Sequence, residues 1–311
     1  MSASRGLAAV TGATGFLGQH LVRALADDGW RVRILARRDP ISPFWAGITP
    51  EVTPGDLGDA RALARLCEGA DLVVHAAGLL FGADDALIRV NVDGTRALAA
   101  AAAGAPQVIH VSSLVAREPQ LSPYAASKRA GEDLALSLLG DRVTVVRPPA
   151  VYGPGDRETL RLFQLAAASP ILPTFDPRAR IAAIHAQDAA RQIAALAGSS
   201  PGTGPFALVD ERPEGYGWRE LMGTAAEAFG RRSRLVQVPG ATIYAVASIV
   251  AFANSWRKNK AMITFGKVRE LTHLDWGVRP NERAARAPAS DFSLLSGFRQ
   301  TIGWYRSQGW L

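Results

Sequence analysis

The sequence predicts an α/β fold in which a doubly wound parallel sheet is followed by a smaller C-terminal lobe. Three observations lead to this prediction: short apolar runs recur through the first half, helix-like stretches separate them, and proline and glycine become frequent after Pro149. Runs that are apolar on both faces are typical of buried parallel strands joined by crossover helices. We therefore expect strands at Leu7–Val10, Val32–Leu35, Leu72–His75, Val108–Val111 and Val143–Val146.

Composition supports a well-packed chain in a reducing compartment. Of the 311 residues, 48% are hydrophobic and 20% charged, which is enough apolar material for a core. The single cysteine, Cys67, excludes an internal disulfide, and the first residues lack the long apolar stretch of a secretory signal. We therefore expect a cytoplasmic protein.

The net charge of +7 and the pI of about 10.0 allow three kinds of partner: nucleic acid, anionic lipid or a phosphate-bearing cofactor. The arginines are scattered and do not form a stripe interleaved with aromatic residues. This distribution disfavours nucleic acid.

Directly after the first expected strand, the segment Thr11-Gly-Ala-Thr-Gly-Phe-Leu-Gly18 leads into the helical run Gln19–Ala26. Glycines at this spacing allow a tight turn, a close approach of backbone to a pyrophosphate, and close packing of helix on strand. The helix N-terminus adds partial positive charge. Because both strand and helix are in place, the pattern predicts a dinucleotide site over a simple structural turn.

This site defines the expected domains. We expect residues 1–150 to form a Rossmann-type nucleotide-binding domain, to which a helix near residues 186–198 returns. Residues 151–311 then form a substrate-binding lobe. No internal repeat interrupts this division.

Two arginines stand where a carboxylate would mark a preference for NAD. The second expected strand ends at Leu35-Ala36, and Arg37-Arg38 follow it. Guanidinium groups suit a ribose 2′-phosphate in geometry and in charge. We therefore predict NADP(H) as the cofactor, the alternative being two solvated surface arginines.

Further motifs follow in order along the chain: Gly55-Asp56-Leu57, His75-Ala-Ala-Gly78, Asn91-Val-Asp-Gly-Thr95, Val111-Ser-Ser113, Tyr124-Ala-Ala-Ser-Lys128 and Arg147-Pro-Pro-Ala-Val-Tyr-Gly-Pro-Gly-Asp156. With the glycine loop, this series resembles the extended short-chain dehydrogenase/reductase family, of the NAD-dependent epimerase/dehydratase type. The resemblance is specific over the first 200 residues and loose beyond them. The ending Asp291–Tyr305 is most similar to the dihydroflavonol reductase and 3β-hydroxysteroid dehydrogenase branch.

The resemblance implies roles for particular residues. It implies a catalytic set of Ser113, Tyr124 and Lys128, with Asn91 as a further member, and it implies a homodimer. The residues that it places at NADP(H), together with those of the glycine loop and the arginine pair, are Gly12, Thr14, Gly15, Phe16, Leu17, Gly18, Arg37, Arg38, Asp56, Leu57, Ala76, Ala77, Gly78, Tyr124, Lys128, Pro148 and Val151.

The spacing of Tyr124 and Lys128 suits proton transfer, because residues four apart share one face of a helix. We expect the ammonium and the oxidised nicotinamide to lower the tyrosine pKa from about 10 toward 7, a preference of about 4 kcal/mol. Tyr124 would then give a proton to a carbonyl oxygen that Ser113 binds, while the cofactor gives hydride to the carbon.

Several alternatives remain open at these positions. Ser112 and Ser113 also suit local backbone bonds at a strand end. Asn91 is expected either to hold a backbone group or water in the proton path, or to have only a structural role. Ten residues separate Ser113 from Tyr124, fewer than sugar-nucleotide epimerases of the family usually have.

The histidines His75, His110 and His185 are neither clustered nor spaced as metal ligands, so we predict no metal.

The segment Ala241–Ala253 has thirteen uncharged residues and is followed by Trp256 and a basic cluster up to Lys260. It is too short to span a bilayer and is typical of a core helix, an interfacial segment or the wall of an apolar pocket. A peripheral contact with anionic lipid at the inner face of a membrane is one expectation.

Three functions follow. The favoured one is an NADPH-dependent reductase of a ketone on a bulky apolar substrate, such as a 3-keto sphingolipid, a ceramide or a sterol. The alternatives are a sugar-nucleotide epimerase or dehydratase, and a non-catalytic NADP-binding protein.

Overall fold

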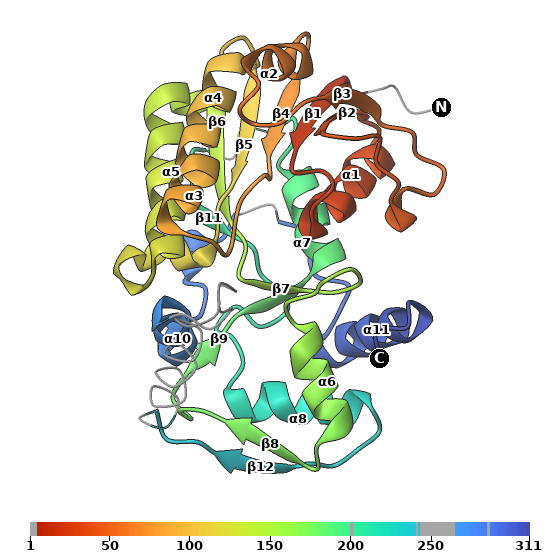
Figure 1. The fold of residues 1–311 in the computed structure, drawn as a ribbon, viewed down its shortest axis with the longest axis vertical. Coiled ribbons are helices and arrows are strands. Elements are labelled where there is room, and N and C mark those ends of the chain that lie inside the picture. The colour runs from red at the N-terminus through yellow and green to blue at the C-terminus, as the bar shows by residue number, and fades with distance from the viewer. Residues whose placement is uncertain (1–4, 200–201, 241, 243–264, 285–286) are drawn as a thin grey trace.

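A seven-stranded parallel sheet forms the centre of the computed structural model, which describes residues 5–199, 202–240, 242, 265–284 and 287–311 (Figure 1). Its strands lie in the order β11-β6-β5-β4-β1-β2-β3. They are β1 Leu7–Thr11, β2 Arg31–Ala36, β3 Glu51–Pro54, β4 Leu72–His75, β5 Gln107–Val111, β6 Val143–Arg147 and β11 Phe206–Ala207. All their pairings are parallel. The five predicted strands are confirmed, whereas β3 and β11 were not predicted.

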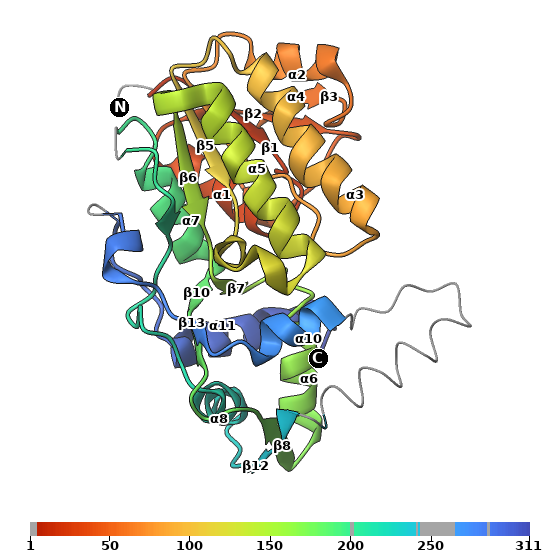
Figure 2. The same cartoon turned by 90° about the vertical axis from the view of Figure 1, so that its left-hand side faces the viewer.

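Helices cover both faces of the sheet (Figures 1 and 2). Alternate residues of β1 show why: Ala8 and Val10 belong to one buried core, and Ala9 belongs to the other. On the first face lie α1 Phe16–Asp27 and α7 Ala186–Ala195, and on the second lie α2 Ala60–Cys67, α4 Gly94–Ala101 and α5 Pro123–Leu139. The predicted doubly wound α/β fold is therefore confirmed.

Smaller elements form the lower part of the molecule in Figure 1. Aromatic side chains fill its core, where Phe298 packs edge to face against Tyr152 and Phe163 at ring centroid distances of 4.9 and 5.0 Å. The elements are β7 Ala150–Tyr152, α6 Leu160–Ala168, β8 Ile171–Thr174, β9 Arg180–Ile181, β10 Ala183–His185, α8 Trp218–Ala228, β12 Arg234–Gln237, α10 Phe265–Thr272, β13 Asp275–Trp276 and α11 Leu294–Ser307.

The chain passes between the two parts more than once. After β10, helix α7 packs against α1, and β11 then pairs with β6 at the sheet edge. In the other direction, Phe44 from the loop after β2 stacks on Trp304 of α11 at 5.9 Å. The division into domains near residue 150 stays a prediction.

Register brings the sequence motifs to one edge of the sheet. Thr11 at the end of β1 is paired with His75 at the end of β4, and His75 is paired with His110 near the end of β5. The glycine loop and the segments that follow β4 and β5 therefore leave the sheet side by side, at the carboxyl ends where α/β folds bind ligands.

Candidate active site

The glycine loop is built for close backbone contact. Gly12 has a φ of +73°, and a Cβ there would lie 2.4 Å from the backbone nitrogen of Ala77. A Cβ on Gly18 would lie 2.0 Å from the carbonyl oxygen of Gly12. Gly15 is the N-cap of α1, and both it and Thr14 are exposed. The N-terminus of α1 is thus open to an anion such as a pyrophosphate, which fits a dinucleotide.

Arg37 and Arg38 are exposed just beyond β2. Within the part of the chain that the structure describes, neither guanidinium makes a hydrogen bond or an ion pair. Asp56 lies in the neighbouring turn, because Ala36 pairs with Pro54 and the Asp56 carboxylate accepts a 2.8 Å hydrogen bond from the Gly58 amide. The two arginines are therefore free to bind a phosphate at this edge.

Helix α5 carries both Tyr124 and Lys128. It begins at Ser122-Pro123, where the Ser122 hydroxyl caps it by accepting a 3.0 Å hydrogen bond from the Ala125 amide. Lys128 is buried, and its Nζ donates a 2.9 Å hydrogen bond to the carbonyl of Val111. Burial lowers the Lys128 pKa to about 8, against the opposing effect of a nearby carboxylate. Lys128 is therefore still largely charged at neutral pH.

The pKa of Tyr124 is raised to about 12, so the expectation of an acidic phenol is wrong for the groups of the protein itself. Burial is the main cause, a hydrogen bond with the Ser113 side chain lowers the value, and the negative charge of Glu270 raises it. Tyr124 is accordingly a protonated phenol beside Ser113, which is the form of a proton donor.

Ser112 and Ser113 differ in their surroundings. The Ser113 hydroxyl accepts a 3.4 Å hydrogen bond from the Val115 amide, so the local backbone contact is present beside the one with Tyr124. The Ser112 hydroxyl is buried and has no hydrogen-bond partner among the described residues. The structure thus brings Ser113 to Tyr124, and the catalytic role of Ser113 stays a prediction.

Asn91 lies in a π-helical turn, Arg89–Asp93, and its side chain is fully engaged. Its Oδ1 accepts a 2.8 Å hydrogen bond from the Leu79 amide, while Nδ2 donates to the Leu79 carbonyl and to the Ser127 hydroxyl at 3.0 and 2.9 Å. Ser127 in turn donates to the Tyr124 carbonyl at 2.8 Å. Asn91 therefore ties the segment after β4 to the helix that carries Tyr124.

Two of the histidines do lie together, which corrects the expectation that they are not clustered. The rings of His75 and His110 are 5.3 Å apart, and the two nitrogens of His75 contact the hydroxyls of Thr11 and Thr95 at 2.7 and 3.2 Å. Burial lowers the pKa of His75 to about 3 and that of His110 well below its usual range. His185 packs on Phe292 instead. The described ranges hold no group of three potential metal-ligating side chains, and the absence of a metal stays a prediction.

The first residue of the last motif, Arg147, takes part in a buried ion pair. Arg147, at the end of β6, donates two hydrogen bonds of 2.8 and 2.6 Å to the carboxylate of Glu132 on α5. The same motif supplies Pro148, whose carbonyl accepts a 2.8 Å bond from Leu114, and Val151, which pairs with Ile184. The pair fixes α5 against the sheet one turn beyond Lys128.

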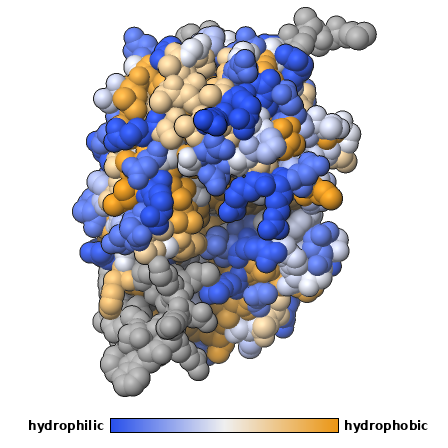
Figure 3. Space-filling model, turned by 45° about the horizontal axis from the view of Figure 1, so that its top comes forward, coloured by the Kyte–Doolittle hydropathy of each residue, from blue (hydrophilic) through white to orange (hydrophobic). Residues whose placement is uncertain are grey.

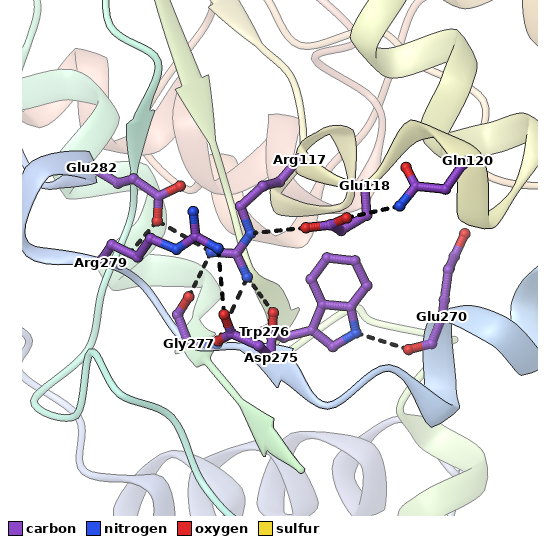
Figure 4. Close-up of polar contacts among 9 residues, drawn as sticks. All are labelled: Arg117, Glu118, Gln120, Glu270, Asp275, Trp276, Gly277, Arg279 and Glu282. Atoms are coloured by element: carbon purple, nitrogen blue, oxygen red, sulfur yellow. Dashed lines mark hydrogen bonds and ion pairs between the residues drawn. The ribbon is translucent and has the colours of Figure 1, made fainter.

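Residues from the C-terminal segment that sequence reasoning missed also reach this region (Figure 4). Glu270 of α10 accepts a hydrogen bond from Ser122, 148 positions earlier in the chain. Arg117 donates to the carbonyl of Gly277 and to Glu282, at 2.8 and 3.2 Å. The Ser-Pro helix start was a readable signal for Ser122, but no local pattern marks the other contacts.

The segment Ala241–Ala253 and the basic cluster after it lie outside the described residues, apart from Thr242. Among the residues that are described, none forms a helix long and apolar enough to cross a membrane. Hydrophilic residues with small apolar patches among them cover the face seen in Figure 3. A cavity of about 130 Å³ in the lower part is lined by Phe175, Trp218 and Leu271, among others.

The parallel sheet, the open glycine loop and the Ser, Tyr and Lys side chains at one edge define a nicotinamide-dependent enzyme of the oxidoreductase and epimerase class. The model of the NAD dependent epimerase/dehydratase family matches residues 8–202, and the chain belongs to this family. The resemblance seen in the sequence is thereby confirmed.

Two named proteins are similar in sequence to this chain. The chain is 49% identical to a ceramide reductase of Caulobacter vibrioides over 310 residues, which cover 99% of this chain and 97% of that protein. It is 38% identical to sterol demethylase protein B of Methylococcus capsulatus over 170 residues, which cover 47% of this chain and 52% of that protein.

Solved structures agree with the fold. The structure of gox2253 has a TM-score of 0.78 at 22% identity and covers 99% of this chain and 100% of its own. The structure of MoeE5 in complex with UDP-glucuronic acid and NAD has a TM-score of 0.72 at 24% identity and covers 97% of this chain and 99% of its own. At these identities the likeness shows the fold alone.

Proposed function

We propose that this protein is an NADPH-dependent reductase that acts on a ketone of a bulky, apolar, lipid-like substrate, such as a 3-keto sphingolipid, a ceramide or a sterol. The observation that carries the proposal is the protonated phenol of Tyr124 beside the Ser113 hydroxyl, at the carboxyl edge of the sheet. A donor in this form suits reduction, in which a carbonyl oxygen must receive a proton.

The side chains have distinct roles in this reaction. A bound nicotinamide supplies the hydride that reduces the carbonyl carbon. Ser113 donates a hydrogen bond to the carbonyl oxygen, and Tyr124 transfers its phenolic proton to that oxygen, so that an alcohol and a phenolate result. Lys128, with a pKa of about 8, is charged at neutral pH and stabilises the phenolate until a solvent proton restores the phenol. Asn91 holds the helix that carries Tyr124 in place.

NADPH is proposed over NADH because Arg37 and Arg38 are exposed beside the expected ribose site. Two forked cations there would bind a 2′-phosphate. The other proposed cofactor contacts are the glycine loop and the residues Phe16, Leu17, Asp56, Leu57, Ala76, Ala77, Gly78, Pro148 and Val151. Comparable catalytic efficiency with NADH and NADPH would contradict this choice.

The lipid-like substrate is supported by the relatives named ceramide reductase and sterol demethylase protein B. A ketone on such a molecule is met at a membrane surface, so a peripheral contact with anionic lipid is part of the proposal. Sedimentation with vesicles of phosphatidylglycerol and phosphatidylcholine tests it, and the protein should remain in the supernatant with phosphatidylcholine alone. A homodimer is proposed from the family resemblance and is tested by light scattering.

The central experiment follows NADPH absorbance at 340 nm with a panel of ketones, including 3-keto sphingolipids and sterol ketones. Net consumption with a lipid ketone supports a reductase. Product without net consumption would support the alternative, a sugar-nucleotide epimerase or dehydratase, which keeps its cofactor through turnover and whose fold the structure of MoeE5 shares.

Three variants test the residues. Tyr124→Phe should lower kcat by a factor of 10² to 10⁴, the usual contribution of a positioned acid, with NADPH binding retained. Ser113→Ala should lower kcat, whereas Ser112→Ala is the matched control, because the Ser112 hydroxyl has no hydrogen-bond partner to lose. If Tyr124→Phe reduces ketones as fast as the wild type, the phenol is not the acid. If neither protein reduces any ketone and the substitution leaves the biological activity unchanged, the non-catalytic alternative gains support.

A further inference from the structure

We propose that Glu270 of α10 is a positioning residue that anchors the C-terminal part of the chain to the start of α5 and brings a negative charge into the neighbourhood of Tyr124. This inference rests on the proposed function of Tyr124 as a proton donor. It assigns a role to a residue 146 positions away from that tyrosine in the sequence.

The first support is the direct contact between Glu270 and the cap of α5. Glu270 is only 5% exposed, and its carboxylate accepts hydrogen bonds from the Ser122 hydroxyl and, at 3.1 Å, from Lys267. The same Ser122 hydroxyl caps α5 two residues before Tyr124. A Cβ on Gly266 would lie 2.8 Å from the Ser122 Cβ. Helix α10 therefore approaches this cap so closely that only glycine fits at position 266.

The second support is an anchor at the other end of the short connection between Ser113 and Tyr124. The indole of Trp276 donates a 2.8 Å hydrogen bond to the Glu270 carbonyl, and the Arg117 guanidinium lies over the Trp276 ring at 5.8 Å (Figure 4). Arg117, with a side chain 6% exposed, also donates to Gly277 and Glu282. Residues 265–282, which we call the clasp, thus hold this connection at both ends.

The clasp brings a carboxylate, Glu270, and a cation paired with it, Lys267, to the start of α5. Glu270 is the carboxylate whose charge acts on Tyr124, and the Ser113 side chain opposes it through a hydrogen bond. Lys267 pairs with Glu270, and its charge also reaches Glu158 from the lower part of the molecule. Lys128, one turn further along α5, is directed to Val111. Because a phenolate beside Glu270 would be a second negative charge, the carboxylate favours the phenol.

Glu270→Gln separates charge from hydrogen bonding, since the amide oxygen still accepts from Ser122. Titration of ¹³C-labelled tyrosine rings by NMR, with Tyr124 assigned from Tyr124→Phe, measures the phenol without any substrate. We expect the Tyr124 pKa of about 12 to fall, and a fall of about one unit would increase the ionised fraction at pH 10.5 about eightfold. Glu227→Gln, on an exposed residue of α8, is the matched control and should leave the titration unchanged.

Lys267→Met gives a test of opposite sign on a side chain that is 39% exposed and therefore tolerant of substitution. Removing this cation should raise the Tyr124 pKa, so the ionised fraction at pH 10.5 should fall.

The outcomes separate the two proposals. If the Tyr124 titration changes by less than 0.2 units in both variants, the role of Glu270 is wrong even when the wild type reduces ketones. If the titrations shift as stated but the wild type consumes no NADPH with any ketone, the electrostatic link stands and the reductase assignment falls. An equal loss of rate at every pH, with unchanged titration, would make Glu270 merely structural and overturn the inference.

Discussion

The buried ion pair between Arg147 and Glu132 is the interaction whose loss we expect to cost most. Its two hydrogen bonds measure 2.8 and 2.6 Å, and the side chains are 9% and 3% exposed. Glu132→Gln would leave a guanidinium in the interior without a counter-charge, which destabilises proteins by about 3–5 kcal/mol. At about 2 °C per kcal/mol for a chain of this size, Tm should fall by about 6–10 °C.

The same substitution should affect the candidate site through Lys128. Glu132 raises the Lys128 pKa, which burial holds at about 8. A further fall of about one unit would reduce the charged fraction at pH 7.5 from about three-quarters to about one-quarter. The high-pH decline of ketone reduction should then begin about one unit lower.

Urea unfolding followed by tryptophan fluorescence measures the stability change. Asp133→Asn is the matched control, because this neighbouring carboxylate is 59% exposed in a surface pair with Arg129 and should contribute less than about 0.5 kcal/mol. A loss below about 1 kcal/mol in Glu132→Gln would refute the reasoning, since it would mean that water reaches the guanidinium.

Three more predictions concern the cofactor site and Lys128. Replacing Arg37 and Arg38 together by alanine should raise KM for NADPH by about tenfold or more and leave KM for NADH nearly unchanged, as measured at 340 nm; equal changes for both cofactors would argue against a phosphate contact. Gly12→Ala should abolish NADPH binding in calorimetry, because its φ is +73° and a Cβ would meet backbone at 2.4 Å, whereas Gly29→Ala, with a φ of +89° and open space, should cost only about 1 kcal/mol of stability and spare binding. Lys128 has a pKa of about 8 in the folded protein, against a usual value of 10.5. Between these pH values the unfolded chain binds more protons than the folded one, so the contribution of Lys128 to the free energy of unfolding should rise from pH 8 to 10.5. Lys128→Met should lack that rise in urea unfolding at a series of pH values, and a rise of equal size in both proteins would contradict the assignment.

The centre of the sheet could be predicted from the sequence because its strands are buried on both faces. Leu72–His75, for example, was expected and found over the same residues. The edge strands escaped prediction for a physical reason. β3 reads Glu-Val-Thr-Pro and β11 has two residues, so neither has an apolar run that stands out from a loop.

The candidate site was predictable where its residues are close in the chain, as with the glycine loop and the Tyr124–Lys128 spacing. The direction in which the Tyr124 pKa shifts was not predictable, because it depends on burial and on Glu270, and both arise only when the chain is folded. The pairing of His75 with His110 was likewise a matter of strand order, since neighbouring strands bring together residues 35 positions apart.

The late position of α7 and β11 in the chain bears on how the protein can be divided for expression. A fragment cut after residue 150 would lack α7, which packs against α1, and would expose the part of α1 that α7 covers; β6 would become a bare edge strand. Such a fragment should aggregate. A soluble nucleotide-binding fragment would have to extend at least through Ala207, and would therefore include β7 to β10 as well.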